Sequence, residues 1–170
     1  MNDLRDTLLT ISEIAIAIIG FTGLIGILVR RQRVEVFSEE FFKLRMMLEY
    51  GLLTLGGALL PFLVFNFGLS DPTSWRISSG LMLGAGLTYV AVNRGEFFMQ
   101  VRQPGVLTWI FVSGDLIFSL LNLANALGIF FEPSSLPYVS AVYWCLLGAT
   151  VGFVRLIALV WTPSDTPPAS

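Results

Sequence analysis

Long apolar runs dominate the chain, and charged residues, proline or turn-forming residues separate one run from the next. Each run is close to the roughly 20 residues that an α-helix needs to cross about 30 Å of hydrocarbon. The runs are residues 7–29, 46–69, 75–93, 106–130 and 138–161, of which the third is the shortest. The pattern therefore predicts an all-α protein, a polytopic transmembrane bundle of about five helices.

The segments outside these runs have a different composition. Residues 34–45 alternate apolar and charged side chains, which suits a short interfacial helix in the headgroup region that runs into the second span; a hydrated loop is the alternative. The last residues are rich in proline and poor in apolar side chains, which is typical of disorder. We therefore expect a transmembrane helical domain over residues 1–162 and a disordered tail over residues 163–170.

The overall composition agrees with a membrane location. Of 170 residues, 55% are hydrophobic and only 13% are charged, whereas a soluble domain carries about a quarter charged residues. A soluble fold of this size could not wet its surface with so few charges. The net charge of −2 and the scattered positive residues also exclude the basic stripe that nucleic-acid binding requires.

Few residues with catalytic chemistry are present. The chain has no histidine, and Cys145 and Lys43 are its only cysteine and its only lysine. These counts exclude intrachain disulfides, structural zinc sites and imidazole ligation of haem. With no nucleophile–base pair or metal-ligand cluster in the pattern, we expect no enzyme activity, no cofactor and no bound metal.

The positive charges also predict an orientation. With the N-terminus outside, the cytoplasmic segments hold seven Lys and Arg residues, and the opposite side holds only Arg5 and Arg76. The positive-inside rule therefore favours an outer N-terminus and a cytoplasmic C-terminus. We expect a multi-pass protein of a bacterial inner membrane.

Three ionisable residues, Glu13, Asp115 and Arg155, fall within the predicted spans. Each would cost roughly 2.5 to 3.5 kcal/mol at the bilayer centre, so each should face protein or water. Counted from the cytoplasmic ends of their spans, Asp115 lies about 14 Å deep and Arg155 about 9 Å deep, which predicts an ion pair between them. The alternative is that Arg155 reaches the headgroups and Asp115 is only hydrogen-bonded. Near the cytoplasmic end of the second span, Arg45 at i−4 could neutralise Glu49.

The predicted fourth span carries a polar face. Thr108, Asp115, Ser119 and Asn122 share one side of a helix, with Asn125 near the outer end. Such a face forms either a polar seam that holds helices together or a hydrated path. We select Asp115, Ser119, Asn122 and Asn125, together with Glu13, as candidate ion-binding or pore-lining residues. Glu13 shares a small and polar face with Thr10, Ala17 and Gly20; a protonated carboxyl bonded to a neighbouring carbonyl is its alternative role.

Small residues indicate close helix packing. Glycines recur at three- or four-residue spacing in three of the predicted spans, which lets helix backbones approach each other in lipid. They are Gly20, Gly23 and Gly26, then Gly80 and Gly84, and finally Gly148 and Gly152. Pro61 removes the helical bond to the Gly57 carbonyl, which predicts either a hinge or a static bend there.

Two functions fit this pattern. The first is a channel or carrier for protons or small cations that uses the intramembrane carboxylates and works as a homo-oligomer in the lipid bilayer. The second is a non-conducting assembly, anchor or sensor subunit that acts through helix packing and through a protein partner at the cytoplasmic loop, residues 30–45. Flux in liposomes would separate the two.

Overall fold

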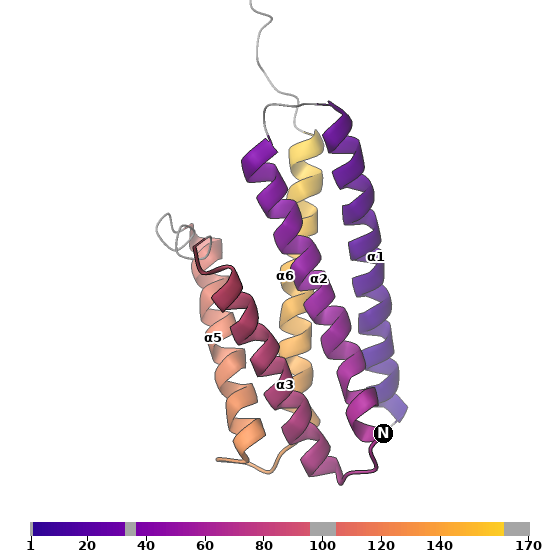
Figure 1. Cartoon of the computed structure of the whole chain (residues 1–170), viewed down its shortest axis with the longest axis vertical. Helices are drawn as coiled ribbons and strands as arrows, with labels where there is room; N and C mark the ends of the chain where they lie inside the picture. The colour runs from indigo at the N-terminus through magenta and orange to yellow at the C-terminus, as the bar shows by residue number, and fades with distance from the viewer. Residues whose placement is uncertain (1, 33–36, 96–104, 162–170) are drawn as a thin grey trace, which may run out of the picture.

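The computed structural model describes residues 2–32, 37–95 and 105–161, and this part of the chain is helical apart from short connections. Its long helices alternate in direction and lie side by side (Figure 1). They are α1 (Asn2–Gln32), α2 (Phe37–Phe65), α3 (Asp71–Val92), α5 (Val106–Leu127) and α6 (Ser135–Trp161). The prediction of an all-α fold is confirmed.

Four of these helices are long and apolar enough to cross a membrane. The candidate spans are Asp3–Ile27, Leu44–Phe65, Thr108–Leu127 and Ser135–Ile157. The predicted third span also forms a helix, α3, but it is not among them. Three of the four residues that α3 buries are serines, and serine lowers the hydropathy of the segment. All five expected helices are thus present among the described residues, and four of them are candidate spans by length and composition.

The segment between the first two runs is helical from Phe37 onward and continues without a break into α2, which ends at Phe65, as expected of a helix that runs into the second span. Its position in the headgroup region stays a prediction. No glycine or proline interrupts residues 37–50, and nothing therefore ends the helix before the apolar part begins. Residues 33–36 and the predicted disordered tail lie outside the described residues.

Two helix ends show how α3 and α5 are fixed to each other. α3 begins after the N-cap residue Ser70, with Pro72 in its first turn. α5 ends at Gly128, whose φ of 67° is readily adopted only by glycine. Arg76 of α3 donates to the carbonyls of Ala126 and Leu127 at 3.3 and 2.7 Å. This cation satisfies carbonyls that the end of α5 leaves open and suits the negative end of the helix dipole.

The helices enclose an interior with two unlike parts. α2 packs against α1, α3 and α6, and α5 packs against α3 and α6. Between α1, α2 and α6 the buried side chains are mainly aliphatic, such as Ile11, Ile18, Val142 and Leu146. On the side of α3 and α5, the buried residues include Ser74, Ser78, Ser79, Asn122 and Asn125.

The outward faces of α3 and α5 are apolar. Leu81, Leu87 and Val90 of α3 are exposed, as are Leu116 and Leu120 of α5. These two helices thus turn leucine outward and serine or asparagine inward, which is the reverse of a helix in a water-soluble protein. The distribution fits an apolar environment around the bundle.

Candidate functional site

Asp115 lies at the centre of the polar side of the bundle. Its Oδ2 accepts a hydrogen bond of 3.0 Å from the Tyr50 hydroxyl, and its Oδ1 accepts one of 2.8 Å from Trp144 Nε1. Tyr50 belongs to α2 and Trp144 to α6, so one carboxylate on α5 joins three helices. Both of these partners are neutral.

The sequence around Asp115 explains how Trp144 reaches it. Gly114 lies directly against the indole, and a Cβ at this position would overlap the Trp144 ring. The ring also packs between Phe111 and Phe118, at centroid distances of 5.4 and 5.3 Å. Gly114 therefore leaves space for the indole, and the adjacent Asp115 accepts the hydrogen bond from its N–H group.

A second polar group lies toward the end of the bundle where α2 begins. Arg45 Nε donates to Glu49 Oε1 at 2.8 Å, which confirms the expected i,i+4 pair, and Arg45 Nη2 donates to Asn93 Oδ1 at 2.7 Å. Asn93 in turn donates to the Tyr89 carbonyl. The Tyr89 ring lies edge-on to that of Tyr50, at 5.8 Å. A series of polar and tyrosine side chains thus leads from Arg45 to Asp115. Its members are Asn93, Tyr89 and Tyr50.

Asn125 occupies the opposite end of the polar side. Its Nδ2 donates to Ser79 Oγ at 2.8 Å and to the Ser134 carbonyl at 3.0 Å, and its Oδ1 accepts from the Ser134 backbone N–H at 2.9 Å. The side chain is completely buried. These bonds attach the connection between α5 and α6 to α3, so Asn125 has an evident structural role.

Toward the end of the bundle where Asn125 lies, some buried oxygen atoms have no partner among the described residues. Asn122 Nδ2 donates to the Phe118 carbonyl, but Asn122 Oδ1 accepts no hydrogen bond within the described residues. Ser74 Oγ and Ser78 Oγ of α3 also lack partners there. Buried polar atoms are almost always hydrogen-bonded in proteins, either to protein or to water. These oxygens are therefore suited to bind internal water.

The structure does not bring Asp115 and Arg155 together. Arg155 is exposed, and it lies eleven residues beyond Trp144 on α6, a distance of about 16 Å along the helix. The depth estimate assumed that α5 and α6 end at the same level. In Figure 1 the upper ends of α3 and α5 lie well below that of α6. In place of the expected ion pair, Asp115 bonds to Tyr50 and Trp144.

Ser119 also lies apart from the interior. It is exposed, because the buried side of α5 is centred on Phe118, Asn122 and Asn125. Adjacent residues are separated by about 100° around a helix, which turns Ser119 away from that side. Of the candidate residues on α5, the structure thus groups Asp115, Asn122 and Asn125 on the inner side.

Glu13 lies on the outer side of α1 and is exposed. α1 contacts α2 and α6 but neither α3 nor α5, so Glu13 and Asp115 do not share a cavity. Among the described residues, no hydrogen bond or ion pair engages the Glu13 side chain. The neighbouring Gly20 and Gly23 have open space where a Cβ would be. Among the described residues, no side chain of another helix covers Glu13 or Gly20 on this small and polar face of α1.

The other glycines differ in how closely they pack. Gly148 and Gly152 of α6 lie against Tyr50 and Met47 of α2, and Gly26 of α1 lies against Leu44. Gly80 has only Ala126 near it, and Gly84 has open space. Small residues therefore bring α6 and α1 close to α2, whereas the Gly80–Gly84 side of α3 is open.

The Gly57 carbonyl that Pro61 leaves without its helical partner is satisfied by another helix. The Tyr138 hydroxyl of α6 donates to it at 2.5 Å, and Tyr138 is completely buried. α2 remains one helix through Pro61. The contact holds this part of α2 against α6, and movement at Gly57 and Pro61 stays a prediction.

The sequence pattern did not identify Tyr50, Trp144 or the inward serines of α3. Two signals were present: a tryptophan in the middle of an apolar run, away from the interfaces where this residue is common, and serines at i, i+4 and i+5 from Ser74. Within the described residues, no group of three or more Asp, Glu, Cys or His could hold a metal ion.

No protein family, no curated protein and no solved structure matches this chain.

Proposed function

We propose that this protein is a multi-pass membrane protein that moves protons across the bilayer through the polar side of its own bundle, with Asp115 as the central proton acceptor and donor. The observation that carries the proposal is the set of buried polar groups between α2, α3, α5 and α6. It contains the carboxylate of Asp115 and three buried oxygens that have no partner among the described residues. Carboxylates in such surroundings are common in proton relays.

The chemistry around Asp115 favours protons over metal cations. A sodium or calcium ion is held by several oxygen ligands, whereas Asp115 is surrounded by the Tyr50 hydroxyl and the N–H group of Trp144. An N–H group cannot coordinate a cation. The Tyr50 hydroxyl both donates and accepts hydrogen bonds, so it can pass a proton to or from the carboxylate.

The proposed route has two halves. On the side where α2 begins, protons enter near Glu49 and reach Asp115 by way of Tyr50. On the other side, they leave through water bound to Asn122, Ser78 and Ser74. Every group on this route belongs to one chain, so the route needs no second subunit.

We place the protein in a bacterial inner membrane with its N-terminus outside, because the positive residues cluster in the segments that would then be cytoplasmic. The outer side of α1 is the proposed contact for a homo-oligomer, since Glu13 is exposed there and Gly20 has open space beside it in the part of the chain that the structure describes. The segment 30–45 remains the proposed contact for a protein partner.

The test is proton flux into liposomes that contain the purified protein, followed with a trapped pH-sensitive dye under an imposed gradient. Asp115→Asn keeps the shape of the side chain but removes its titratable group, and we expect the flux to fall by about a hundredfold or more. Glu13→Gln is the contrasting variant and should retain wild-type flux. Wild-type protein without flux above that of empty vesicles would refute the proposal.

Glu13→Gln also tests where the path lies. If this variant loses flux and Asp115→Asn retains it, the path runs between subunits along α1 and not through the bundle.

A non-conducting membrane subunit is the second candidate. It is favoured by the hydrogen bonds of Asp115 and Asn125, which join helices in the manner of a polar seam. If the protein is such a subunit, Asp115→Asn would weaken the fold, and neither the wild type nor this variant would conduct protons.

A further inference from the structure

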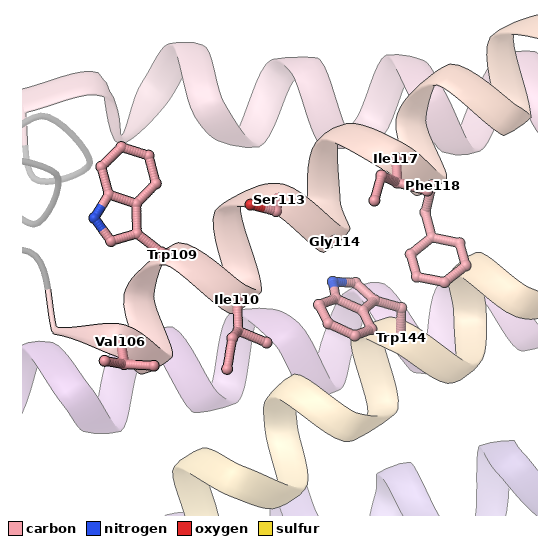
Figure 2. A pocket seen from close by; sticks show the side chains of 8 residues that line it. All are labelled: Val106, Trp109, Ile110, Ser113, Gly114, Ile117, Phe118 and Trp144. Atoms are coloured by element: carbon pink, nitrogen blue, oxygen red, sulfur yellow. The ribbon is translucent and has the colours of Figure 1, made fainter.

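A groove of about 600 Å³ runs along the outer side of α5 and reaches α6. Its wall is formed by the aliphatic residues Val106, Ile110 and Ile117 and by the rings of Trp109, Phe118 and Trp144 (Figure 2). The polar side-chain groups of α5 in this wall are the Ser113 hydroxyl and the Trp109 indole N–H. None of the described residues that line the groove is charged.

The dimensions of the groove restrict what can occupy it. From Val106 to Phe118 the wall spans thirteen residues of one helix, or about 18 Å along the helix axis. It is open to the outside along α5. Its occupant must therefore be long, apolar and aligned with the helix, as the acyl chains of a bilayer are.

Trp144, whose hydrogen bond positions Asp115, forms the inner wall of the groove. The donor of this bond is Nε1 of the indole. Because Gly114 has no side chain, the indole lies directly against α5, where it also packs against the rings of Phe111 and Phe118. Pressure on the groove side of the ring would hold the indole against the carboxylate.

We propose that the groove binds one acyl chain of an anionic phospholipid, and that the bound chain holds Trp144 in contact with Asp115. The membrane location rests on the proposed function, but lipid binding does not depend on proton movement. The end of the groove at Val106 lies at the same end of the bundle as the last turn of α3 (Figure 1). Arg94 follows that turn and is exposed, which provides a positive charge for the lipid phosphate.

Native mass spectrometry of the detergent-solubilised protein tests the binding. After delipidation and titration with phosphatidylglycerol, the wild type should bind one lipid per chain with saturation. Ile110→Trp fills the groove and should weaken this binding by about tenfold or more, since each methylene excluded from the groove lowers the affinity. Leu120→Trp is the matched control: it makes the same kind of change at an exposed residue of α5 outside the groove, and its binding should equal that of the wild type.

The headgroup and the ring give two further readouts. Arg94→Gln should remove the preference for phosphatidylglycerol over phosphatidylcholine. Phosphatidylglycerol with brominated chains should quench tryptophan fluorescence in the wild type, and Trp144→Phe should remove more of this quenching than Trp75→Phe, because Trp75 is buried between Phe65 and Tyr138.

Equal lipid binding by Ile110→Trp and Leu120→Trp would overturn the proposal, because it would identify only general contact with lipid. A dimer that appears in place of the lipid-bound chain, and that Ile110→Trp abolishes, would assign the groove to a second copy and would also overturn it. Binding without proton flux would leave this proposal standing and reject the proposed function.

Discussion

At the scale of single residues, the position of Asp115 explains most of what is unusual in this chain. Its carboxylate lies in an apolar stretch, yet its partners are a hydroxyl and an indole N–H and not a cation. Burial of an ionised carboxylate costs free energy, which hydrogen bonds offset only in part. The fold should therefore depend strongly on each of the two donors.

Trp144→Phe keeps an aromatic ring on α6 and removes the N–H donor. We expect it to lower the free energy of unfolding by about 1.5–3 kcal/mol, the range for hydrogen bonds to charged groups. Denaturation of the detergent-solubilised protein measures this change. The control is a double-mutant cycle with Asp115→Asn, in which the two effects should be non-additive by about 0.5–3 kcal/mol. Additive effects would mean that the bond contributes nothing.

Gly114→Ala tests the space beneath the indole. The added methyl group overlaps the Trp144 ring, so either the ring or α5 must move, and we expect a loss of about 1–3 kcal/mol together with altered near-ultraviolet circular dichroism. Gly84→Ala is the matched control, because its methyl group meets open space in a helix. That variant should be unchanged or more stable by up to about 1 kcal/mol. Equal behaviour of the two variants would contradict the packing described here.

At the scale of the elements, the contact between α2 and α6 depends on a carbonyl that proline frees. Tyr138→Phe leaves the Gly57 carbonyl buried without a donor and should cost about 1–3 kcal/mol of stability. Tyr143→Phe changes a half-exposed tyrosine of the same helix, and its effect should stay within about 0.5 kcal/mol. Thermal unfolding in detergent compares the two. If Tyr138→Phe is as mild as Tyr143→Phe, the hydrogen bond does not hold the two helices together.

The helices themselves could be predicted from the sequence, because the length of each apolar run and the punctuation between runs fix their positions. α5 begins at Val106, the residue at which the predicted run begins. The apolarity of α3 was overestimated, since its serines were not weighed as a buried face. The helix before the second span could be predicted because charged residues such as glutamate and lysine are good helix formers, so the segment from Phe37 continues into the apolar part of α2.

The rotation of each helix and its offset along the bundle could not be predicted. Ser119 shares a sequence spacing with Asp115 and Asn122, but about 100° of rotation separates it from Phe118, which faces inward. Arg155 matched Asp115 in depth only while all helices were assumed to end in one plane. The rotation and the offset of α5 depend on contacts that are distant in sequence. Those of Asp115 are with Tyr50 of α2 and Trp144 of α6.

At the scale of the whole molecule, the bundle combines an aliphatic half with a polar half. The aliphatic half between α1, α2 and α6 accounts for the packing of the core. The polar half contains Asp115, Asn122 and Asn125 and three of the four buried oxygens that have no partner among the described residues, the fourth being Thr22 Oγ1 of α1. A protein that needed only a stable bundle would gain by replacing those oxygens, because an unpaired buried hydroxyl is destabilising.

Ser78→Ala separates stability from function on this basis. Removal of a buried hydroxyl without a protein partner should leave the unfolding free energy unchanged or raise it by up to about 1 kcal/mol. The same variant should lower proton flux in liposomes, because the proposed route loses one of its oxygens. Ser119→Ala, on the outer side of α5, should change neither quantity. A less stable Ser78→Ala protein with unchanged flux would assign the hydroxyl to packing alone.

Proton movement through the bundle requires water in the polar half. An experimental structure of the protein in lipid, at a resolution that reveals ordered water, tests this requirement directly. We predict water within hydrogen-bonding distance of Asn122 Oδ1 and Ser78 Oγ, in a chain that leads toward Asp115. If both oxygens instead bond to neighbouring side chains and the space between α3 and α5 is dry, the interior is a structural seam and carries no protons.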